Sequence, residues 1–192
     1  MDEVTNAFLK WTKDNKDFEE SVHVVKSNSQ GRLWMIGGFV YKTIISELYG
    51  NKKPELSLRF FVEKPNENIK SYGWWVYNKQ DKNGNYLFSS TEKLMMFTPL
   101  DRIRPMREMG IEPTINNYFF GIPLTVQAIV YDVNNSKIIG ERGINSIMKK
   151  TVGINSRKFA ERAARKLNIG LEEYVQNKAD ELGFRVEGFY GR

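Results

Sequence analysis

The chain has 192 residues, 41% hydrophobic and 27% charged, which is typical of one globular domain, or one domain with a small appendage, and not of a disordered chain. It has no cysteine and one histidine, which excludes disulfides, thiolate metal sites, cysteine nucleophiles and histidine-rich zinc sites, and leaves His23 for any Ser-His-Asp triad. The net charge of +6 favours anionic partners only mildly, and the absence of any apolar run near 18 residues predicts a cytoplasmic protein without a membrane partner.

The first third of the chain is predicted to alternate helices with strands. Apolar residues at helical spacing predict the helices, and alternating apolar residues predict the strands. On the strand that carries it, His23 is interpreted as an ordinary surface or half-buried histidine. The expected elements are a helix over 2–20, a strand over 21–26, a strand over 32–36 ending at Gly37-Gly38, a helix over 39–49 ended by Gly50, and a strand over 55–63.

The rest of the chain is predicted to be rich in strands first and helical at its end. The Asn83-Gly84 pair indicates a hairpin turn. The adjacent pair Trp74-Trp75 is interpreted either as hairpin packing or as a platform on which bases stack. The expected elements are strands over 72–77, 86–88, 93–98, 124–133 and 138–139, and helices over 101–109 and 143–150, from 156, and over 171–182.

The positive charge is concentrated in residues 149–166. This segment holds seven cationic residues against one acid, so its net charge equals that of the whole chain. The pattern indicates a surface facing nucleic acid or phosphate, or else a solvated helix face. A helix-turn-helix is a weaker interpretation, because Glu172-Glu173 would oppose phosphate at the start of the second helix. The candidate nucleic-acid-binding residues share one helix face: Lys158, Arg162, Arg165 and Lys166.

Three blocks of sequence resemble one known family. Residues 34–38 followed by 56–62, then 121–132, then 138–147 resemble the head of polymerase-β-type nucleotidyltransferases, in particular CCA-adding enzymes and bacterial poly(A) polymerases. The resemblance covers roughly residues 32–150. It implies an α+β fold with a mixed β-sheet flanked by helices and a C-terminal helical pair. We expect a nucleotidyltransferase-like domain over 1–150 and a basic helical extension over 151–192.

The resemblance also implies a site from which this chain departs. In the family, the Gly-Gly turn lets the backbone approach a triphosphate, and two aspartates on the next strand hold two Mg²⁺ ions. Here Ser57 and Arg59 stand in the aspartate positions, and a register slipped by two residues supplies only Glu55. The later strand that usually carries a third acid is apolar over 94–97, and Ile122-Pro123 replaces an Arg-Asp pair that helps to bind nucleotide.

We therefore expect a catalytically degenerate nucleotidyltransferase-fold protein that is retained for binding a nucleotide, a nucleic acid such as RNA, or another protein. No catalytic residue, metal ligand or cofactor is expected. Arg59 is interpreted as a cation that replaces the metals, or as a structural arginine paired with Glu55, Glu63 or Asp132. Lys42 is interpreted as a phosphate contact or as a surface lysine. The candidate phosphate-binding residues are Gly37, Gly38, Lys42, Ser57 and Arg59.

Three alternatives remain open on the sequence alone. One is an active transferase in which Mg²⁺ is held by a rearranged set of acids, Glu55, Glu63, Glu92, Asp101 and Asp132. Another is a nucleic-acid-binding module that works through residues 149–166. The last is a structural subunit of a larger assembly. The question of enzymatic activity is thus open, and the missing carboxylates weigh against it.

Overall fold

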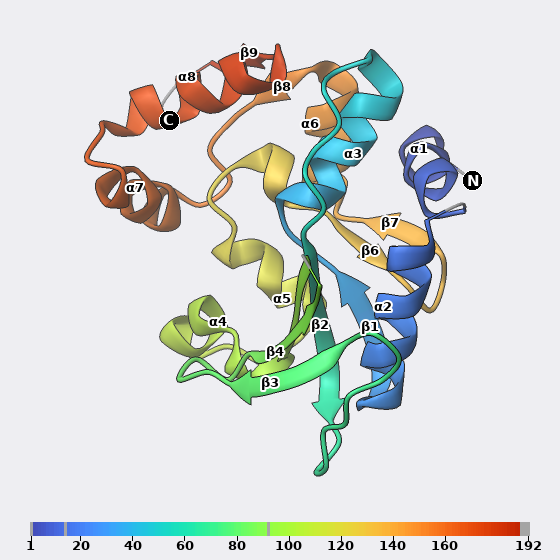
Figure 1. Cartoon of the computed structure of the whole chain (residues 1–192). Helices are drawn as coiled ribbons and strands as arrows, with labels where there is room; N and C mark the ends of the chain where they lie inside the picture. Colours follow the sequence, from blue (N-terminus) through green and yellow to red (C-terminus); the bar gives the residue numbers. More distant parts are fainter. Residues whose placement is uncertain (1, 14, 92, 189–192) are drawn as a thin grey trace.

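The computed structural model describes residues 2–13, 15–91 and 93–188. The chain opens with two helices, most strands of the main sheet follow, and helices dominate its end (Figure 1). The predicted α+β class is confirmed. The α-helices are α1 (Glu3–Thr12), α2 (Lys16–Ser27), α3 (Gly38–Tyr49), α4 (Arg104–Met109), α5 (Ile115–Tyr118), α6 (Glu141–Lys149), α7 (Arg157–Lys166) and α8 (Leu171–Leu182). Short 3₁₀ turns are η1 (Leu100–Arg102), η2 (Phe119–Gly121) and η3 (Thr125–Gln127).

Seven strands form one mixed sheet in the order β3-β4-β5-β2-β1-β6-β7. The β2–β5 pair is parallel and the other neighbouring pairs are antiparallel. Two further strands, β8 (Thr151–Val152) and β9 (Arg185–Val186), pair in parallel beside α8. The strands of the main sheet are β1 (Ser29–Met35), β2 (Leu58–Pro65), β3 (Val76–Gln80), β4 (Tyr86–Ser90), β5 (Lys93–Pro99), β6 (Val130–Asp132) and β7 (Lys137–Ile139).

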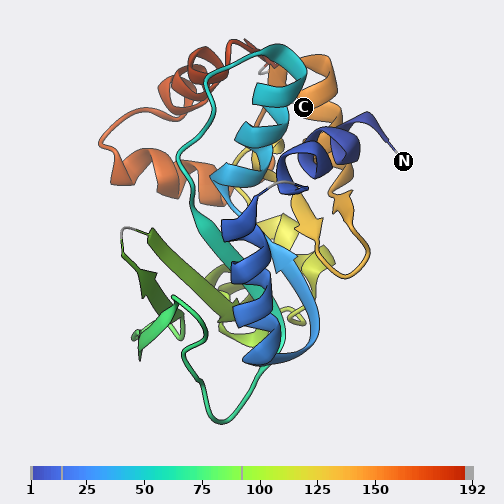
Figure 2. The ribbon, with the colours of Figure 1, turned by 45° about the vertical axis from the view of Figure 1, so that its right-hand side comes forward.

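The two faces of the sheet are covered differently. The larger apolar core lies on one face, where α2 covers the sheet and α1 and α3 pack against each other near its upper end in Figure 2. On β2 this core takes Leu58, Phe60 and Val62, whereas Phe61 joins a smaller cluster with η1, α4 and α5 on the opposite face. Arg59 also points to this second face and is exposed. The alternation predicted for this strand is confirmed, although β2 begins at Leu58, so that Glu55 and Ser57 lie in the preceding loop.

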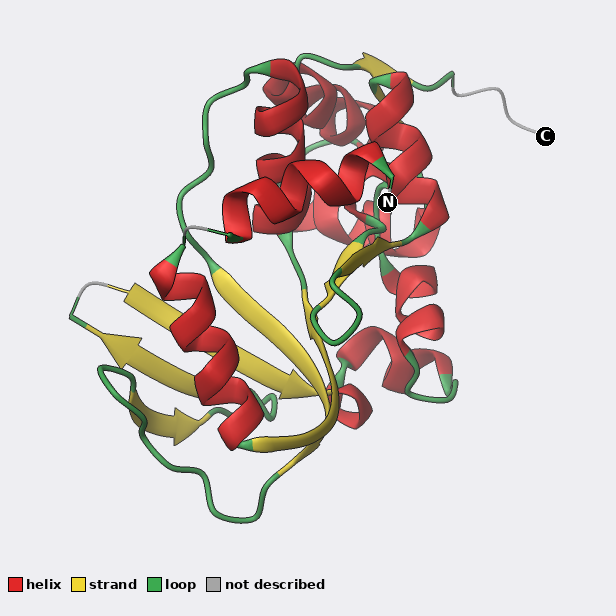
Figure 3. Cartoon of the chain, turned by 90° about the vertical axis from the view of Figure 1, so that its right-hand side faces the viewer, coloured by secondary structure: helices red, strands yellow, loops and turns green. Residues whose placement is uncertain are grey.

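The predicted helix over 2–20 is two helices, and the predicted strand over 21–26 belongs to the second of them, α2 (Figure 3). The Asn15 side chain accepts a hydrogen bond from the Phe18 backbone N–H and begins the new helix. Phe18, Ser21 and Val25 are buried at helical spacing against the sheet, so tertiary packing overrides the preference of valines for strands. His23 is exposed on this helix, and its ring lies 4.4 Å from that of Tyr72.

The predicted strand over 124–133 is also wrong in its first half. Thr125 donates its backbone N–H to the Gly153 carbonyl and accepts the Gly153 N–H on its hydroxyl, so this part pairs with a loop and not with the sheet. Only Val130–Asp132 forms a strand, β6. The first half alternates apolar Leu124 and Val126 with polar Thr125 and Gln127, which is the pattern of a strand, yet it folds as the turn η3 because it pairs with the loop at Gly153.

The C-terminal helical pair is confirmed. Helix α7 buries Phe159, Ala160 and Ala164 and packs against α8, while Leu167, which follows the helix, is 60% exposed. None of the helices within residues 2–13, 15–91 and 93–188 combines the length and the apolar character needed to cross a membrane.

Candidate functional site

The turn between β1 and α3 holds the first part of the candidate site. Gly37 has φ +95°, a left-handed conformation that favours glycine. It caps α3 without a side-chain hydrogen bond, and the first turn of α3 holds no acidic residue. The N-terminus of this 12-residue helix therefore presents backbone N–H groups and the positive end of its dipole without a side chain that compensates them.

Arg59 lies directly against this turn. Its Cδ atom would be 3.8 Å from a Cβ built on Gly37, and its carbonyl accepts a hydrogen bond from the Ile36 N–H at 2.9 Å. The strand therefore holds the base of the Arg59 side chain beside Gly37. The structure brings these two predicted residues together, and Arg59 is exposed.

Two further side chains border Arg59. Met96 is its register partner on β5, the strand on which the resemblance places a third acid. Tyr118 of α5 packs edge-on against Phe61 with 4.8 Å between ring centroids. Burial raises the pKa of Tyr118, and the positive charge of Arg59 opposes that rise. No sequence pattern indicates Tyr118, because this side chain comes near Arg59 only through the packing of α5 on the sheet.

The carboxylates proposed as partners of Arg59 lie elsewhere. Asp132 is 1% exposed and forms a 2.5 Å ion pair with Arg32 of β1, and Glu63 accepts the backbone N–H of Arg32. Glu55 lies in the loop before β2. Within the part of the chain that the structure describes, Arg59 forms no ion pair, so the structural interpretation of Arg59 as a paired arginine is not supported.

The Lys42 side chain forms an ion pair with α8 and not with the Gly37-Gly38 turn. Its ammonium group pairs with Glu181 of α8, which also binds Lys178. Lys42 and Glu181 line a hollow of about 330 Å³ between α3, α8 and the segment 51–55. Ser57 is half-buried in the loop before β2. Of the predicted phosphate-binding residues, Gly37, Gly38 and Arg59 thus form one site, and the Lys42 side chain turns to α8.

A tyrosine pair that the sequence did not indicate flanks the turn. The Tyr41 hydroxyl would be 3.6 Å from a Cβ built on Gly38. Burial raises the pKa values of Tyr41 and Tyr174, and a hydrogen bond with the Gln127 side chain opposes the rise in each. These three residues join α3, η3 and α8 beside Gly38 and fix the helix that carries the turn.

The residues present do not fit the magnesium ions that the fold family implies. A guanidinium is always charged and donates hydrogen bonds only, and a serine hydroxyl alone is a poor ligand for Mg²⁺. No three acidic, histidine or cysteine side chains gather as metal ligands within residues 2–13, 15–91 and 93–188. Of the rearranged acids, Glu92 lies outside the described residues, and Asp101 of η1 lies beside Arg102 at 3.8 Å.

The replaced Arg-Asp pair has a structural role here. Ile122 is buried, and its carbonyl accepts a hydrogen bond from the Asn155 side chain at 2.9 Å. The Pro123 carbonyl accepts the backbone N–H groups of Asn155 and Ser156. The pair therefore anchors the loop before α7 and supplies no charged group to a nucleotide.

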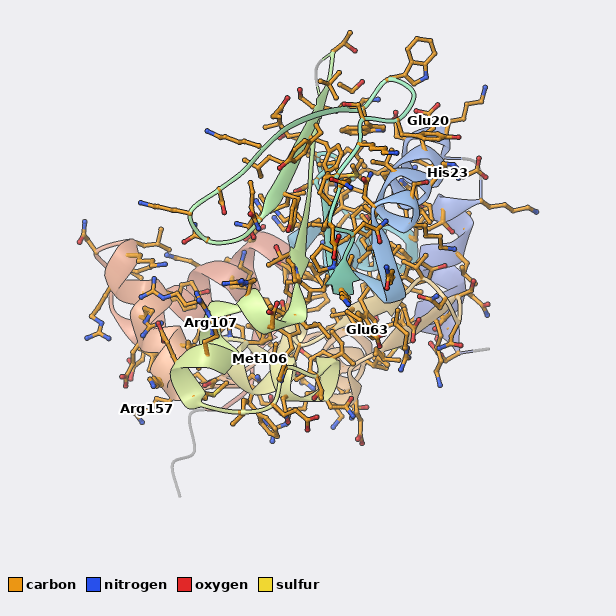
Figure 4. The ribbon with its side chains drawn as sticks, turned by 90° about the horizontal axis from the view of Figure 1, so that it is seen from below. Glu20, His23, Glu63, Met106, Arg107 and Arg157 are labelled. Atoms are coloured by element: carbon orange, nitrogen blue, oxygen red, sulfur yellow. The ribbon has the colours of Figure 1, made fainter. Side chains whose placement is uncertain are left out.

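The basic surface spans α7 and α4. Arg162 of α7 forms a 2.6 Å ion pair with Glu108, which also binds Arg104 of α4, and these contacts lower the pKa of Glu108. Figure 4 shows Arg107 of α4 and Arg157 of α7 on the same side of the molecule, away from Glu20 and His23 of α2. Of the four predicted residues, Lys158, Arg165 and Lys166 are exposed, and Arg162 is held by Glu108.

Comparisons with known proteins agree with this architecture. No protein-family model matches the sequence, and the search of curated proteins found no match. Among solved structures, a CCA-adding enzyme with CTP matches at 16% identity with a TM-score of 0.63, covering 96% of this chain and 43% of that one. A CCA-adding enzyme with ATP matches at 17% identity and 0.61, covering 94% and 41%, and the Thermotoga maritima CCA-adding enzyme complexed with tRNA matches at 14% and 0.59, covering 97% and 42%.

The chain has a nucleotidyltransferase-like fold. The similarity covers nearly the whole chain and not only residues 32–150, so the N-terminal helices and the C-terminal helical pair are in large part shared. The chain spans about two fifths of the length of these enzymes. In this nucleotidyltransferase-like fold, Arg59 therefore occupies the sheet face beside the Gly37-Gly38 turn where the family resemblance places metal-binding aspartates.

Proposed function

We propose that this chain is a catalytically degenerate nucleotidyltransferase-fold protein that binds the phosphate groups of a nucleotide at Gly37-Gly38 without a metal ion. The observation that carries the proposal is the Arg59 side chain, held against Gly37 without an ion-pair partner among the described residues. A fixed guanidinium can donate two parallel hydrogen bonds to a phosphate.

The helix start supports the same ligand. The uncapped first turn of α3 offers backbone N–H groups and the positive end of the helix dipole to an anion. Arg59 adds a full positive charge beside it. In this proposal the guanidinium neutralises the phosphate directly, which is the task that two magnesium ions perform in the active enzymes that the sequence resembles.

Nucleotide binding can be tested by calorimetric titration of the pure protein with ATP and CTP in EDTA. We expect binding in the micromolar to millimolar range and at least tenfold weaker binding to Arg59→Gln. Arg185→Gln is a matched control, because Arg185 is an exposed arginine on β9. Equal affinities of the wild type and Arg59→Gln would contradict the proposed site.

Loss of catalysis needs a separate experiment. The protein is incubated with Mg²⁺ or Mn²⁺, labelled nucleotides and an RNA or protein acceptor. We expect no transfer of label. Robust transfer that is abolished by Glu55→Ala or Glu63→Ala would establish the alternative, an active enzyme with a rearranged acidic site, and would overturn the degenerate assignment.

We propose RNA-backbone binding by α7 as a second function. Lys158, Arg165 and Lys166 are exposed and form no ion pair with a described residue. One structural neighbour is complexed with tRNA. We expect the affinity for a structured RNA to fall steeply with added salt, because each phosphate contact releases counterions. Absent or salt-insensitive binding would remove this function and leave protein binding, or a structural role in a larger assembly, to be tested by pull-down and by mass measurement in solution.

A further inference from the structure

The carboxylate of Glu108 joins two basic helices, α4 and α7. One of its oxygens accepts a hydrogen bond from Nε of Arg104 on the same helix, and the other accepts one from Nη1 of Arg162 on α7, each at 2.6 Å. The Arg162 guanidinium also lies over the Phe159 ring, 5.4 Å from its centroid, which helps to fix its position. The carboxylate thus lies between two arginines that are brought together from different helices.

All three charged side chains of this bridge are accessible to solvent. The side chain of Arg104 is 68% exposed, that of Arg162 is 32% exposed, and that of Glu108 is 25% exposed. Ion pairs at such a surface are weak, because water competes with them and salt screens them. An anionic ligand can therefore reach the two arginines and replace the carboxylate as their partner.

The surroundings of the bridge are strongly basic. Together α4 and α7 hold seven arginine and lysine residues against two acidic ones, and the second acid, Glu161, pairs with Arg157 at 2.9 Å. Arg107 of α4 is exposed and forms no ion pair with a described residue. It lies on the same side of the molecule as Arg157 in Figure 4. This excess of positive charge on two neighbouring helices favours a polyanion as the partner.

A phosphate of an RNA backbone can take the place of the Glu108 carboxylate. Its two non-bridging oxygens share a negative charge, and each can accept a hydrogen bond from one guanidinium, as the two carboxylate oxygens do here. Guanidinium groups suit both kinds of anion, because their fixed N–H donors match the geometry of carboxylates and phosphates alike.

We propose that α4 and α7 form one RNA-binding surface, in which Arg104 and Arg162 make a phosphate site that Glu108 occupies in the free protein. The inference rests on the proposed binding of RNA by α7 and adds α4 and an internal competitor to it. Glu108 holds the two arginines in place and lowers the affinity for RNA, because a phosphate must first displace the carboxylate. Arg107 has no such competitor and contacts the backbone directly.

The internal competitor is tested by Glu108→Gln, which removes the charge and keeps the size of the side chain. The affinity of the full chain for a labelled RNA hairpin is measured by fluorescence anisotropy at several salt concentrations. We expect Glu108→Gln to bind about three- to tenfold more tightly than the wild type, with a slope of log affinity against log salt that is steeper by about 1 to 2. Two more arginines then contact phosphates.

Glu112→Gln is the matched control. Glu112 is exposed in the loop that follows α4 and forms no ion pair with a described residue, so this variant removes one negative charge without freeing an arginine. We expect its RNA affinity to stay within about twofold of the wild type. A denaturation midpoint close to that of the wild type checks that each variant is folded.

The contribution of α4 is tested by two further variants. Arg104→Gln should weaken RNA binding by less than about twofold in the wild type, where Glu108 holds Arg104, and by at least about threefold in the Glu108→Gln background. Arg107→Gln leaves the bridge intact and should weaken binding about two- to threefold. An Arg107→Gln variant that binds as the wild type does, together with equal effects of Arg104→Gln in both backgrounds, would overturn the inclusion of α4.

The failure of this inference can be distinguished from the failure of the proposed function. If the variant Lys158→Gln, Arg165→Gln, Lys166→Gln binds RNA as tightly as the wild type, α7 does not bind RNA and both proposals are overturned. If that variant binds more weakly but Glu108→Gln binds no more tightly than Glu112→Gln, RNA binding by α7 stands and the internal competitor is overturned. Weaker binding by a folded Glu108→Gln would contradict the inference as well, because the carboxylate would then position the arginines for RNA.

Discussion

Two arginines on neighbouring strands have opposite surroundings. Arg32 of β1 is bound by the buried carboxylate of Asp132 and lies 5.2 Å from the centre of the Trp34 ring. Arg59 of β2 lies beside the Gly37 turn and has no ion-pair partner among the described residues. Both residues are exposed. The charge of Arg32 is thus compensated within the sheet, whereas that of Arg59 is not compensated by an ion pair with any described residue, which is why we propose Arg59 as the phosphate-binding group.

The largest expected effect on stability comes from removing the Asp132 carboxylate, which pairs with Arg32. The Asp132 carboxylate also accepts hydrogen bonds from the Asn134 and Asn135 backbones and from the Asn135 side chain. We expect Asp132→Asn to lower the free energy of unfolding by about 2–3 kcal/mol, because several charge-assisted hydrogen bonds are weakened at once. Denaturant unfolding measures it. A change below about 0.5 kcal/mol would show that the pair is not structural.

The same pair predicts a pH dependence. Burial raises the pKa of Asp132, but hydrogen bonds from Asn135 and Arg32 outweigh it, so that the pKa is lowered. The stability from this group is then present above the unfolded pKa of about 4 and is lost as pH falls through the lowered folded value. We expect the stability difference between the wild type and Asp132→Asn to shrink as the pH falls below about 4. A difference that stays constant with pH would contradict this assignment.

Replacing Arg59, which has no ion pair with a described residue, should lower ligand affinity and leave the stability of the protein nearly unchanged. We expect Arg59→Gln to change the free energy of unfolding by less than about 0.5 kcal/mol, because no ion pair with a described residue is lost. ATP affinity should fall about 10- to 100-fold, because a hydrogen bond to a charged group is lost. Arg59→Lys should recover only part of the affinity, because an ammonium cannot donate two parallel bonds. A large loss of stability in Arg59→Gln would make Arg59 structural after all.

The fold was predictable from the sequence where its patterns were local. The Gly37-Gly38 turn, the strand alternation around Phe60 and the hairpin turn at Asn83-Gly84 all appear in the structure. The start of α2 could not be predicted from strand preference, because packing of Phe18 and Val25 on the sheet decides it. The surroundings of Arg59 could not be predicted either, because Tyr118 and Met96 reach it only in three dimensions.

The exposed cations of α7 can be compared with Arg59 in the same way, and we expect each of them to have a smaller effect on ligand affinity than Arg59 has. Lys158, Arg165 and Lys166 are exposed and form no ion pair with a described residue, so each should contribute a modest and salt-sensitive share of RNA affinity. We expect the triple variant Lys158→Gln, Arg165→Gln, Lys166→Gln to bind RNA about tenfold more weakly and to lower the slope of log affinity against log salt by about 2. ATP binding should be unchanged.

A charge-matched control removes the same number of positive charges elsewhere. Lys64→Gln, Lys79→Gln and Lys82→Gln are exposed positions in and between β2, β3 and β4. We expect this control to leave the salt slope within about 0.5 of the wild type. Equal effects of the two triple variants would mean that RNA responds to the net charge of the protein and not to α7.

The smallest expected effect comes from Thr43. We expect Thr43→Val to stabilise the protein by up to about 1 kcal/mol in the absence of ligand, because it removes a buried hydroxyl without a partner among the described residues. ATP affinity should not change, since Thr43 is buried more than one helical turn beyond Gly38 and contributes no group to the proposed phosphate site. Thermal unfolding of the two proteins side by side measures it, and a clear loss of stability would show that the hydroxyl has a structural partner.

The measurement that tests the central proposal most directly is the affinity for ATP with and without magnesium. Titrations in EDTA and in 5 mM free Mg²⁺ should give equal affinities, or weaker binding with the metal, because Mg²⁺ competes with the Arg59 guanidinium for the same phosphate oxygens. Binding that requires Mg²⁺, and that survives Arg59→Gln, would contradict the account and restore a metal-dependent site.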